Sequence, residues 1–232
     1  MFVKDFIHPS FEPFFEENAQ LLAHIESKVE KSSFLPEGRN VLRFSRLDAS
    51  ALRVVILGQD PYPQPGAATG RSFEVGGLHS WLEPFRQSSL RNILRAVYAA
   101  QYGELLKFSE VKAKIASGEF DILPPDRLWD SLEAQGVLFL NTYLTVEPDR
   151  PLSHRALWAE FSRKLIHYID EKSPQAAWFL WGADARGYGK EITRGIKYES
   201  RHPMMCGPWE DDFLKNPCFQ ETKDVISWCG RV

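Results

Sequence analysis

The stretch VVILGQDPYPQPGAATGRSF, residues 54–73, decides the fold class. Its first five residues, Val54–Gly58, are apolar without alternation, which predicts a strand buried on both faces, as in parallel sheets. The Pro- and Gly-rich residues that follow predict a rigid loop. Because ligands of α/β sheets bind beyond the carboxyl ends of the strands, this loop is the first candidate for chemistry.

Two further runs share this consecutive apolar pattern, GVLFLN at 136–141 and AAWFLWG at 176–182. Helix-like stretches begin at Ser88 and at His154, and Ser88 and Ser153 are the candidate caps. Apolar residues at helical spacing predict another helix over residues 14–29. Strands that alternate with helices predict an α/β fold around a mainly parallel central sheet.

Composition excludes several classes of protein. The chain has 232 residues, 28 Lys and Arg against 31 Asp and Glu, and a net charge of −3, which excludes a strongly basic coat and a long acidic tail. A hydrophobic content of 44% predicts a packed globular protein. Three cysteines without a CxxC pair argue against a disulfide framework, a thiolate zinc site and an iron–sulfur cluster. The acidic start and the lack of a long apolar run predict an intracellular protein without a membrane span.

Asp60 is the candidate chemical group of the loop. It stands just after the end of the strand and directly before a stretch that prolines stiffen and that contains Tyr62. The loop lacks the Lys-Ser/Thr ending that nucleotide phosphates and magnesium require, which argues against a P-loop. A local capping role for Asp60 is the simpler alternative. A carboxylate in fixed geometry, however, suits a general base or an electrostatic stabiliser.

The run GQDPYP (58–63) followed by GRSFEV (70–75) resembles the water-activating loop of the family 1 uracil-DNA glycosylases. Further motifs of this family follow in order. They are GVLFLNTYLTV (136–146), PLSHRALWAEF (151–161), FLWGADA (179–185) and RHPMM (201–205). The resemblance implies a divergent member with one domain over residues 1–232, built as a three-layer α/β/α sandwich around a mainly parallel four-stranded sheet. An amino-terminal helical region (1–50) and an inserted segment (about 98–125) have no match.

The resemblance also implies the reaction. The chain is expected to be a monofunctional glycosylase that hydrolyses the N-glycosidic bond of uracil in DNA, without metal or cofactor. Asp60 is the expected catalytic residue that orients the attacking water and stabilises the positive sugar. His202 is the second expected catalytic residue and donates a hydrogen bond to O2 of the leaving base.

Four expected substrate-binding residues complete the base pocket. Tyr62 lies against C5 and excludes the thymine methyl group, Phe73 stacks on the base, and Asn141 reads its Watson–Crick edge. Gln59 shapes the pocket through its backbone. Taken alone, Phe73 is more typical of a core, Asn141 of a turn and His202 of a loop, so their assignment depends on the motifs together. His154 is expected to have a supporting role.

Departures from the family concern the grip on DNA. Pro63 replaces a histidine, and the RHPMM loop lacks the family's phosphate-contacting Ser and its Leu wedge. Met205 or Trp209 is the candidate substitute wedge. The expected DNA-binding residues are Ser88, Ser89, Ala183, Met204 and Met205. A run of basic residues adds a candidate phosphate-binding face: Arg186, Lys190, Arg194, Lys197 and Arg201.

These departures predict a preference for single-stranded or mismatched DNA, since extrusion of a base from a duplex costs more. Two alternatives stay open. One is a glycosylase for another modified base, and the other is a DNA- or protein-binding adaptor that kept the fold. Besides DNA, the inserted segment is a candidate site for a protein partner. The protein is expected to be a cytoplasmic monomer, associated with the nucleoid or located in the nucleus according to the host.

Overall fold

The structure is a computed structural model that describes residue 2 and residues 6–231. Its centre is a sheet of four parallel strands in the order β2-β1-β3-β4. The strands are β1 (Val54–Gly58), β2 (Val137–Asn141), β3 (Ala177–Trp181) and β4 (Ile196–Ser200). The predicted α/β class with a four-stranded sheet is therefore confirmed.

Alternate residues of β1, β2 and β3 enter two separate cores. Val55 and Leu57 belong to one core, whereas Val54 and Ile56 belong to the other. All residues of β1, β2 and β3 are buried. This burial on both faces explains why the three strands read as uninterrupted apolar runs. The edge strand β4 is exposed over most of its length and is correspondingly polar.

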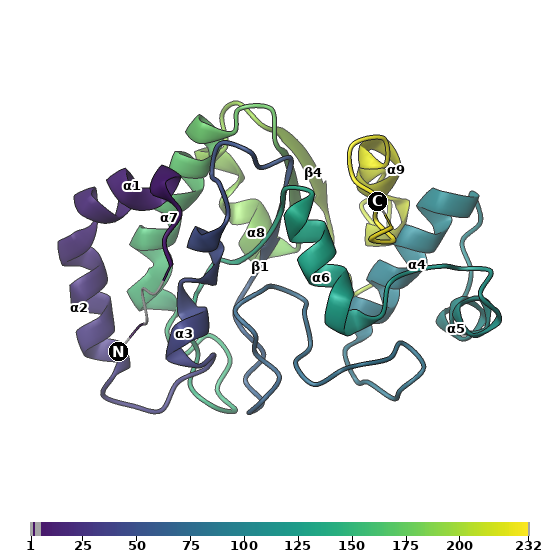
Figure 1. The fold of residues 1–232 in the computed structure, drawn as a ribbon, viewed down its shortest axis with the longest axis horizontal. Coiled ribbons are helices and arrows are strands. Elements are labelled where there is room, and N and C mark those ends of the chain that lie inside the picture. Colours follow the sequence, from purple (N-terminus) through teal and green to yellow (C-terminus); the bar gives the residue numbers. More distant parts are fainter. Residues whose placement is uncertain (1, 3–5, 232) are drawn as a thin grey trace.

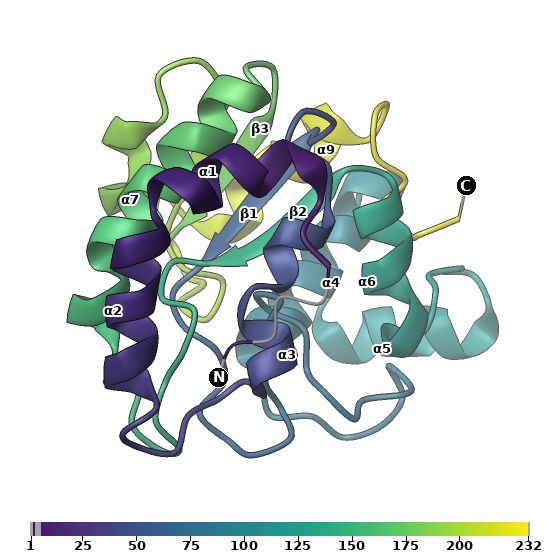
Figure 2. The ribbon, with the colours of Figure 1, turned by 60° about the vertical axis from the view of Figure 1, so that its left-hand side comes forward.

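Helices cover both faces of the sheet, and the three layers are visible in Figures 1 and 2. One face is covered by α1 (Glu12–Glu17), α2 (Ala19–Val29) and α7 (Arg155–Lys172). The other face is covered by α4 (Ser88–Tyr102), α6 (Pro125–Ala134) and α9 (Cys218–Thr222), with α5 (Phe108–Ser117) packed outside α4. The short elements are α3 (Gly38–Val41), α8 (Ala183–Gly187), η1 (Pro9–Phe11), η2 (Arg43–Arg46), η3 (Gly189–Glu191) and η4 (Phe213–Lys215).

Local boundaries differ from the sequence predictions in two places. The helix predicted over residues 14–29 is two helices, because the chain breaks at Asn18, whose side-chain amide donates to the carbonyl of Phe14. The predicted serine caps are wrong. The α4 cap is Gln87, and α7 is preceded by His154, while the Ser153 hydroxyl accepts the N–H of Glu147 at 2.7 Å.

The inserted segment is part of a core. Val111 and Phe120 are buried within it, and the Phe120 ring contacts Tyr98 and Tyr102 edge-on at 5.2 and 5.9 Å between centroids. The indole of Trp81 donates a hydrogen bond to the carbonyl of Leu123 at 2.7 Å. These contacts join the segment to α4 and to the loop before it.

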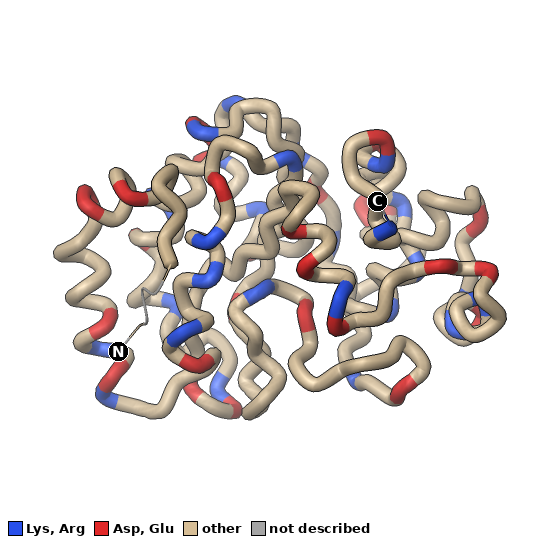
Figure 3. Tube along the Cα trace, in the orientation of Figure 1, with Lys and Arg blue, Asp and Glu red and all other residues tan. Residues whose placement is uncertain are grey.

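Charges of both signs are interspersed along the described trace (Figure 3). In the described part of the chain, no helix combines the length and the apolar character that a membrane crossing requires.

We expect Phe120→Ala to lower the free energy of unfolding by about 3 kcal/mol, because a fully buried ring leaves a cavity when it is truncated. Chemical denaturation followed by both circular dichroism and tryptophan fluorescence measures the change. Leu105→Ala is the matched control, since Leu105 is 49% exposed in the same region, and we expect little change. Separate transitions for the two probes would contradict the prediction that the segment folds with the rest of the chain.

Candidate active site

The candidate site lies where the loop after β1 meets the loop after β2. Beyond the strands, Thr142 and Tyr143 donate their backbone N–H groups to the carbonyls of Gly58 and Gln59, both at 2.9 Å. Gly58 pairs with Asn141 in the strand register. A Cβ at Gly58 would lie 2.6 Å from Oδ1 of Asn141, so glycine is required for the Asn141 side chain to lie there.

Asp60 is held by a backbone amide from a distant loop. Its Oδ2 accepts the N–H of Leu152 at 2.7 Å, and Leu152 has a left-handed backbone, with φ 65°. The N–H of Asp149 in the same loop donates to the carbonyl of Pro63 at 2.9 Å. Burial, assisted by the negative charge of Asp184, raises the pKa of the Asp60 carboxyl, while the Leu152 amide opposes this rise. The carboxylate is therefore fixed in direction and partly desolvated.

Its contacts and its burial favour the neutral form of His202 with the proton on Nε2. Its Nδ1 accepts the backbone N–H of Met204 at 3.1 Å, so the proton of the neutral ring is on Nε2. Burial lowers the pKa of His202, which favours this neutral form. Gly182 has φ 94°, and a Cβ there would lie 3.1 Å from the Cβ of His202. Glycine directly after β3 therefore lets His202, in the loop after β4, approach closely.

Three further side chains surround the same space. The Phe73 ring lies 6.0 Å from the His202 ring at an interplanar angle of 34°. Asn141 is only 3% exposed at the end of β2. Burial raises the pKa of the Tyr62 phenol, which therefore stays protonated. The group combines an aromatic ring, an amide and a phenol around one small region.

One cavity of about 300 Å³ collects these groups. This is the lower end of the size range of small-ligand sites, and it suits a single flat base. The loop after β1 supplies most of its lining, while the ends of β2, α4 and the loop after β4 supply the rest. The lining residues are Gly58, Gln59, Asp60, Pro61, Tyr62, Pro63, Arg71, Phe73, Ser89, Asn141, Pro151, His202 and Met204.

The structure brings all six predicted catalytic and substrate-binding residues to this cavity. Of the predicted DNA-binding residues, Ser89 and Met204 line it. Met204 and Met205 are 60% and 51% exposed. Ser88 is the first residue of α4, and Ala183 is an exposed residue at the start of α8. Neither Ser88, Ala183 nor Met205 lines the cavity.

His154 and the run of basic residues both interact with other groups of the protein. His154 is buried, and its Nδ1 lies 2.9 Å from the hydroxyl of Thr145, which fits a supporting role. Each residue of the basic run has an acidic or carbonyl partner within 4.0 Å, which argues against a phosphate-binding face. The partners are Asp211 for Arg186 and Arg201, Glu191 for Lys190, Glu171 for Arg194, and the carbonyls of Gly189 and Ile192 for Lys197.

Sequence reasoning missed the backbone amide of Leu152 and the side chain of Arg71. Leu152 binds Asp60 through its backbone N–H, which every residue except proline has, so its residue type does not predict this contact. Arg71 borders the cavity although it is only 6% exposed, and it stands within a quoted motif. The available signal was an arginine within the motif that supplies the base pocket. Within the described residues, no group of three or more His, Cys, Asp or Glu is placed to hold a metal ion.

Comparison with known proteins gives the class. A family model described as the uracil DNA glycosylase superfamily matches residues 44–222. Uracil-DNA glycosylase 1 of Streptomyces coelicolor is 35% identical over 199 residues, which cover 85% of this chain and 78% of that protein. The uracil-DNA glycosylase of Acinetobacter baumannii is 33% identical over 216 residues, covering 88% and 78%. The chain belongs to the uracil-DNA glycosylase superfamily.

Solved structures confirm the fold. The wild-type UNG of Nitratifractor salsuginis superimposes with a TM-score of 0.72 at 21% identity, over 95% of this chain and 92% of that one. The mimivirus uracil-DNA glycosylase superimposes with a TM-score of 0.67 at 23% identity, over 85% and 69%. The predicted resemblance and the predicted α/β sandwich are both confirmed.

The raised pKa of Asp60 leads to a pH prediction. If the ionised carboxylate is the active form, the rate falls as the pH falls through this raised pKa. Burial is the main cause of the raised pKa, and Asp184→Asn removes the repulsion that adds to it, so we expect the acid limb of the single-turnover rate to move to lower pH. Glu191→Gln is the matched control, because Glu191 lines the same open groove as Asp184 but does not act on Asp60. An unmoved limb in Asp184→Asn would contradict the assignment.

Proposed function

We propose that this chain releases uracil from DNA by hydrolysing the N-glycosyl bond between base and deoxyribose. The product is an abasic site, and the reaction begins base excision repair. The observation that carries the proposal is one cavity of about 300 Å³ lined by Asp60, Asn141 and His202. Membership of the superfamily and the names of the relatives support it. The chain is therefore a monofunctional hydrolase that acts on N-glycosyl bonds.

Base recognition follows from the groups in the cavity. The Asn141 amide donates to O4 and accepts from N3–H, a pattern that uracil offers and cytosine does not. The Tyr62 ring lies against C5, where a thymine methyl group meets it. Phe73 stacks on the face of the base. The backbone of Gln59, fixed by the N–H of Tyr143, shapes one side of the pocket.

The chemistry needs two charges to be stabilised in turn. When the bond between C1′ and N1 breaks, its electron pair leaves with the base, and the Nε2–H of His202 donates to the developing negative charge on O2. The Asp60 carboxylate stabilises the positive sugar and orients the water that adds to C1′. Both groups are partly buried, which strengthens these interactions relative to water.

We expect Asp60→Asn to lower the single-turnover rate by about 10²- to 10³-fold, with little change in the affinity for uracil-containing DNA. The substitution keeps the shape of the side chain and removes the charge. Asp149→Asn is the matched control, because Asp149 is an exposed aspartate of the adjoining loop, and we expect it to retain wild-type activity. Base release from uracil oligonucleotides measures both rates.

Asn141→Asp tests the specificity in the same assay. A protonated aspartate at this position accepts from and donates to the cytosine edge, so cytosine release is expected to appear. Oligonucleotides with 5-hydroxymethyluracil and 5-hydroxymethylcytosine test the alternative of another modified base. DNA binding without release of any base would favour the adaptor.

We also propose that the loop after β4 separates the bases. Met204 and Met205 are the strongly exposed apolar side chains of this loop, and Met204 lines the cavity. Trp209 is held more firmly, since the guanidinium of Arg201 stacks on its ring at 4.6 Å. Methionine is flexible and makes a weak wedge. The remaining proposed DNA contacts are Ser88 and Ser89 at the start of α4 and Ala183 at the start of α8. With so weak a wedge, we propose a preference for uracil in single-stranded or mismatched DNA.

We expect Met205→Ala to lower kcat/KM for duplex uracil by about tenfold and to leave the value for single-stranded uracil unchanged, because only the duplex needs a base to be extruded. Val225→Ala, which truncates an apolar residue of similar exposure (51%), is the control. Equal losses on both substrates would contradict the wedge and indicate a role in the base pocket.

The chain also suggests an oligomeric state, a site for a partner and a cellular location. We propose a monomer, since one chain supplies all six expected catalytic and substrate-binding residues of the cavity. The exposed Tyr102 and Leu105 beside α5 support the inserted segment as a site for a protein partner. A DNA substrate supports a location in the cytoplasm, at the nucleoid or in the nucleus according to the host.

A further inference from the structure

Arg71 is buried in a cluster of carboxylates beneath the base pocket. It is 6% exposed. Its Nε donates to Oε1 of Glu133 at 2.7 Å, and its Nη2 donates to Oε2 of Glu133 and to Oδ1 of Asp130. Its Nη1 donates to Glu74 at 3.1 Å. Glu133 and Asp130 belong to α6, so the guanidinium joins the loop of residues 58–75 to a rigid helix.

The Arg71–Glu74 pair spans a strained residue. Phe73 lies between the two and has φ 63°, a left-handed conformation that costs a bulky residue roughly 1 to 3 kcal/mol. Its neighbour Ser72 is fixed separately, because the Ser72 hydroxyl donates to the carbonyl of Ile56 at 3.2 Å. Such strain persists only where surrounding contacts hold the backbone in place. The ion pair provides such a contact on both sides of Phe73.

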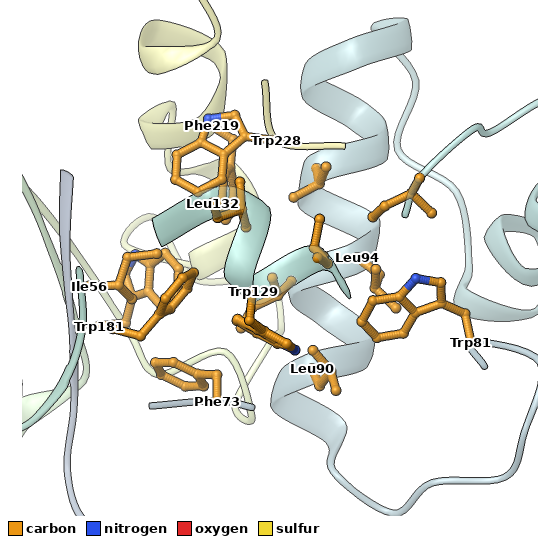
Figure 4. Close-up of a pocket in the computed structure, with 15 residues that line it drawn as sticks. Ile56, Phe73, Trp81, Leu90, Leu94, Trp129, Leu132, Trp181, Phe219 and Trp228 are labelled. Carbon is orange, nitrogen blue, oxygen red and sulfur yellow. The ribbon is translucent and has the colours of Figure 1, made fainter. Parts of the chain in front are cut away.

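The Phe73 ring also has empty space beside it. It lines the base pocket and, in addition, a separate apolar cavity of about 30 Å³. Figure 4 shows Phe73 at the edge of this cavity, near Trp129 and Trp181. An apolar cavity of this kind stays empty of water. A ring released from its backbone constraint therefore has room to move away from the base.

We propose that Arg71 is a positioning residue for base stacking, acting through Phe73 and not through contact with the base. The hydrogen bonds from Arg71 to Glu74 and Glu133 hold the strained turn, and the turn holds the Phe73 ring against the base. The proposal rests on the stacking role of Phe73 in the proposed function.

A double-mutant cycle on the inhibition constant of free uracil tests this coupling. We expect Arg71→Met to raise the inhibition constant by about tenfold in the wild-type background, since a base–aromatic stack contributes on this scale. In a Phe73→Ala background, the same substitution is expected to change it by less than about twofold. The inhibition constant describes the folded enzyme, so a loss of stability alone does not move it. Glu74→Gln, which leaves Arg71 paired with Glu133, repeats the test with a smaller disturbance of folding.

Arg43→Met is the matched control. Arg43 shares the carboxylates of the cluster, at 3.4 Å from Asp130 and 3.9 Å from Glu133, but does not bridge the turn. We expect the inhibition constant of this variant to equal that of the wild type. Equal effects of Arg71→Met in both backgrounds, or no effect with the fold intact, would overturn the proposal. An unchanged inhibition constant in Phe73→Ala itself would instead overturn the stacking role in the proposed function.

Discussion

Parallel pairing of β1 with β2, in one register, is the constraint on which the site depends. It sets Gly58 opposite Asn141, and its hydrogen-bond pattern continues past the strand ends through Thr142 and Tyr143. A shift by one residue would turn Asn141 to the other face of the sheet and bring the wrong carbonyls to the loop. The alternation of two buried faces opposes such a shift, because every apolar side chain of β1 and β2 already packs in one of the two cores.

Burial acts on the two proposed catalytic groups in opposite directions. It raises the pKa of Asp60 and lowers that of His202, because in both cases it disfavours the charged form. For His202 the result is a neutral donor, oriented by the amide of Met204. For Asp60, the amide of Leu152 limits the rise, so a carboxylate remains available in a poorly solvated place. One environment therefore supports both halves of the proposed chemistry.

The loop after β4 and the base pocket differ in how firmly their side chains are held. The loop after β4 exposes flexible methionines, and its basic neighbours are already paired with carboxylates, which weakens the proposed grip on duplex DNA. Beneath the pocket, by contrast, Arg71 and its carboxylates add buried ion pairs around Phe73. Such pairs contribute little net stability, but they fix geometry when every hydrogen bond is satisfied. The base pocket is thus held more firmly than the DNA-facing surface.

The sequence by itself determined the α/β class, three of the four strands and the identity of the six pocket residues. Consecutive apolar residues indicate a strand that is buried on both faces of the sheet, and motifs in a fixed order indicate the family. It did not determine β4, whose exposed edge leaves a polar sequence, or the helix boundaries at Asn18, Gln87 and His154. Neither Gln87 nor His154 caps its helix through a side-chain hydrogen bond, and the Asn18 amide binds back to the carbonyl of Phe14. Only the tertiary structure decided that the Leu152 amide binds Asp60, that Arg71 pairs with Glu74 and Glu133 beside Phe73, and that the inserted segment is part of a core. The contacts of Leu152 with Asp60, of Arg71 with Glu133 and of Trp81 with Leu123 join residues that are distant in the sequence, and a backbone amide or a buried partner leaves no local pattern to read.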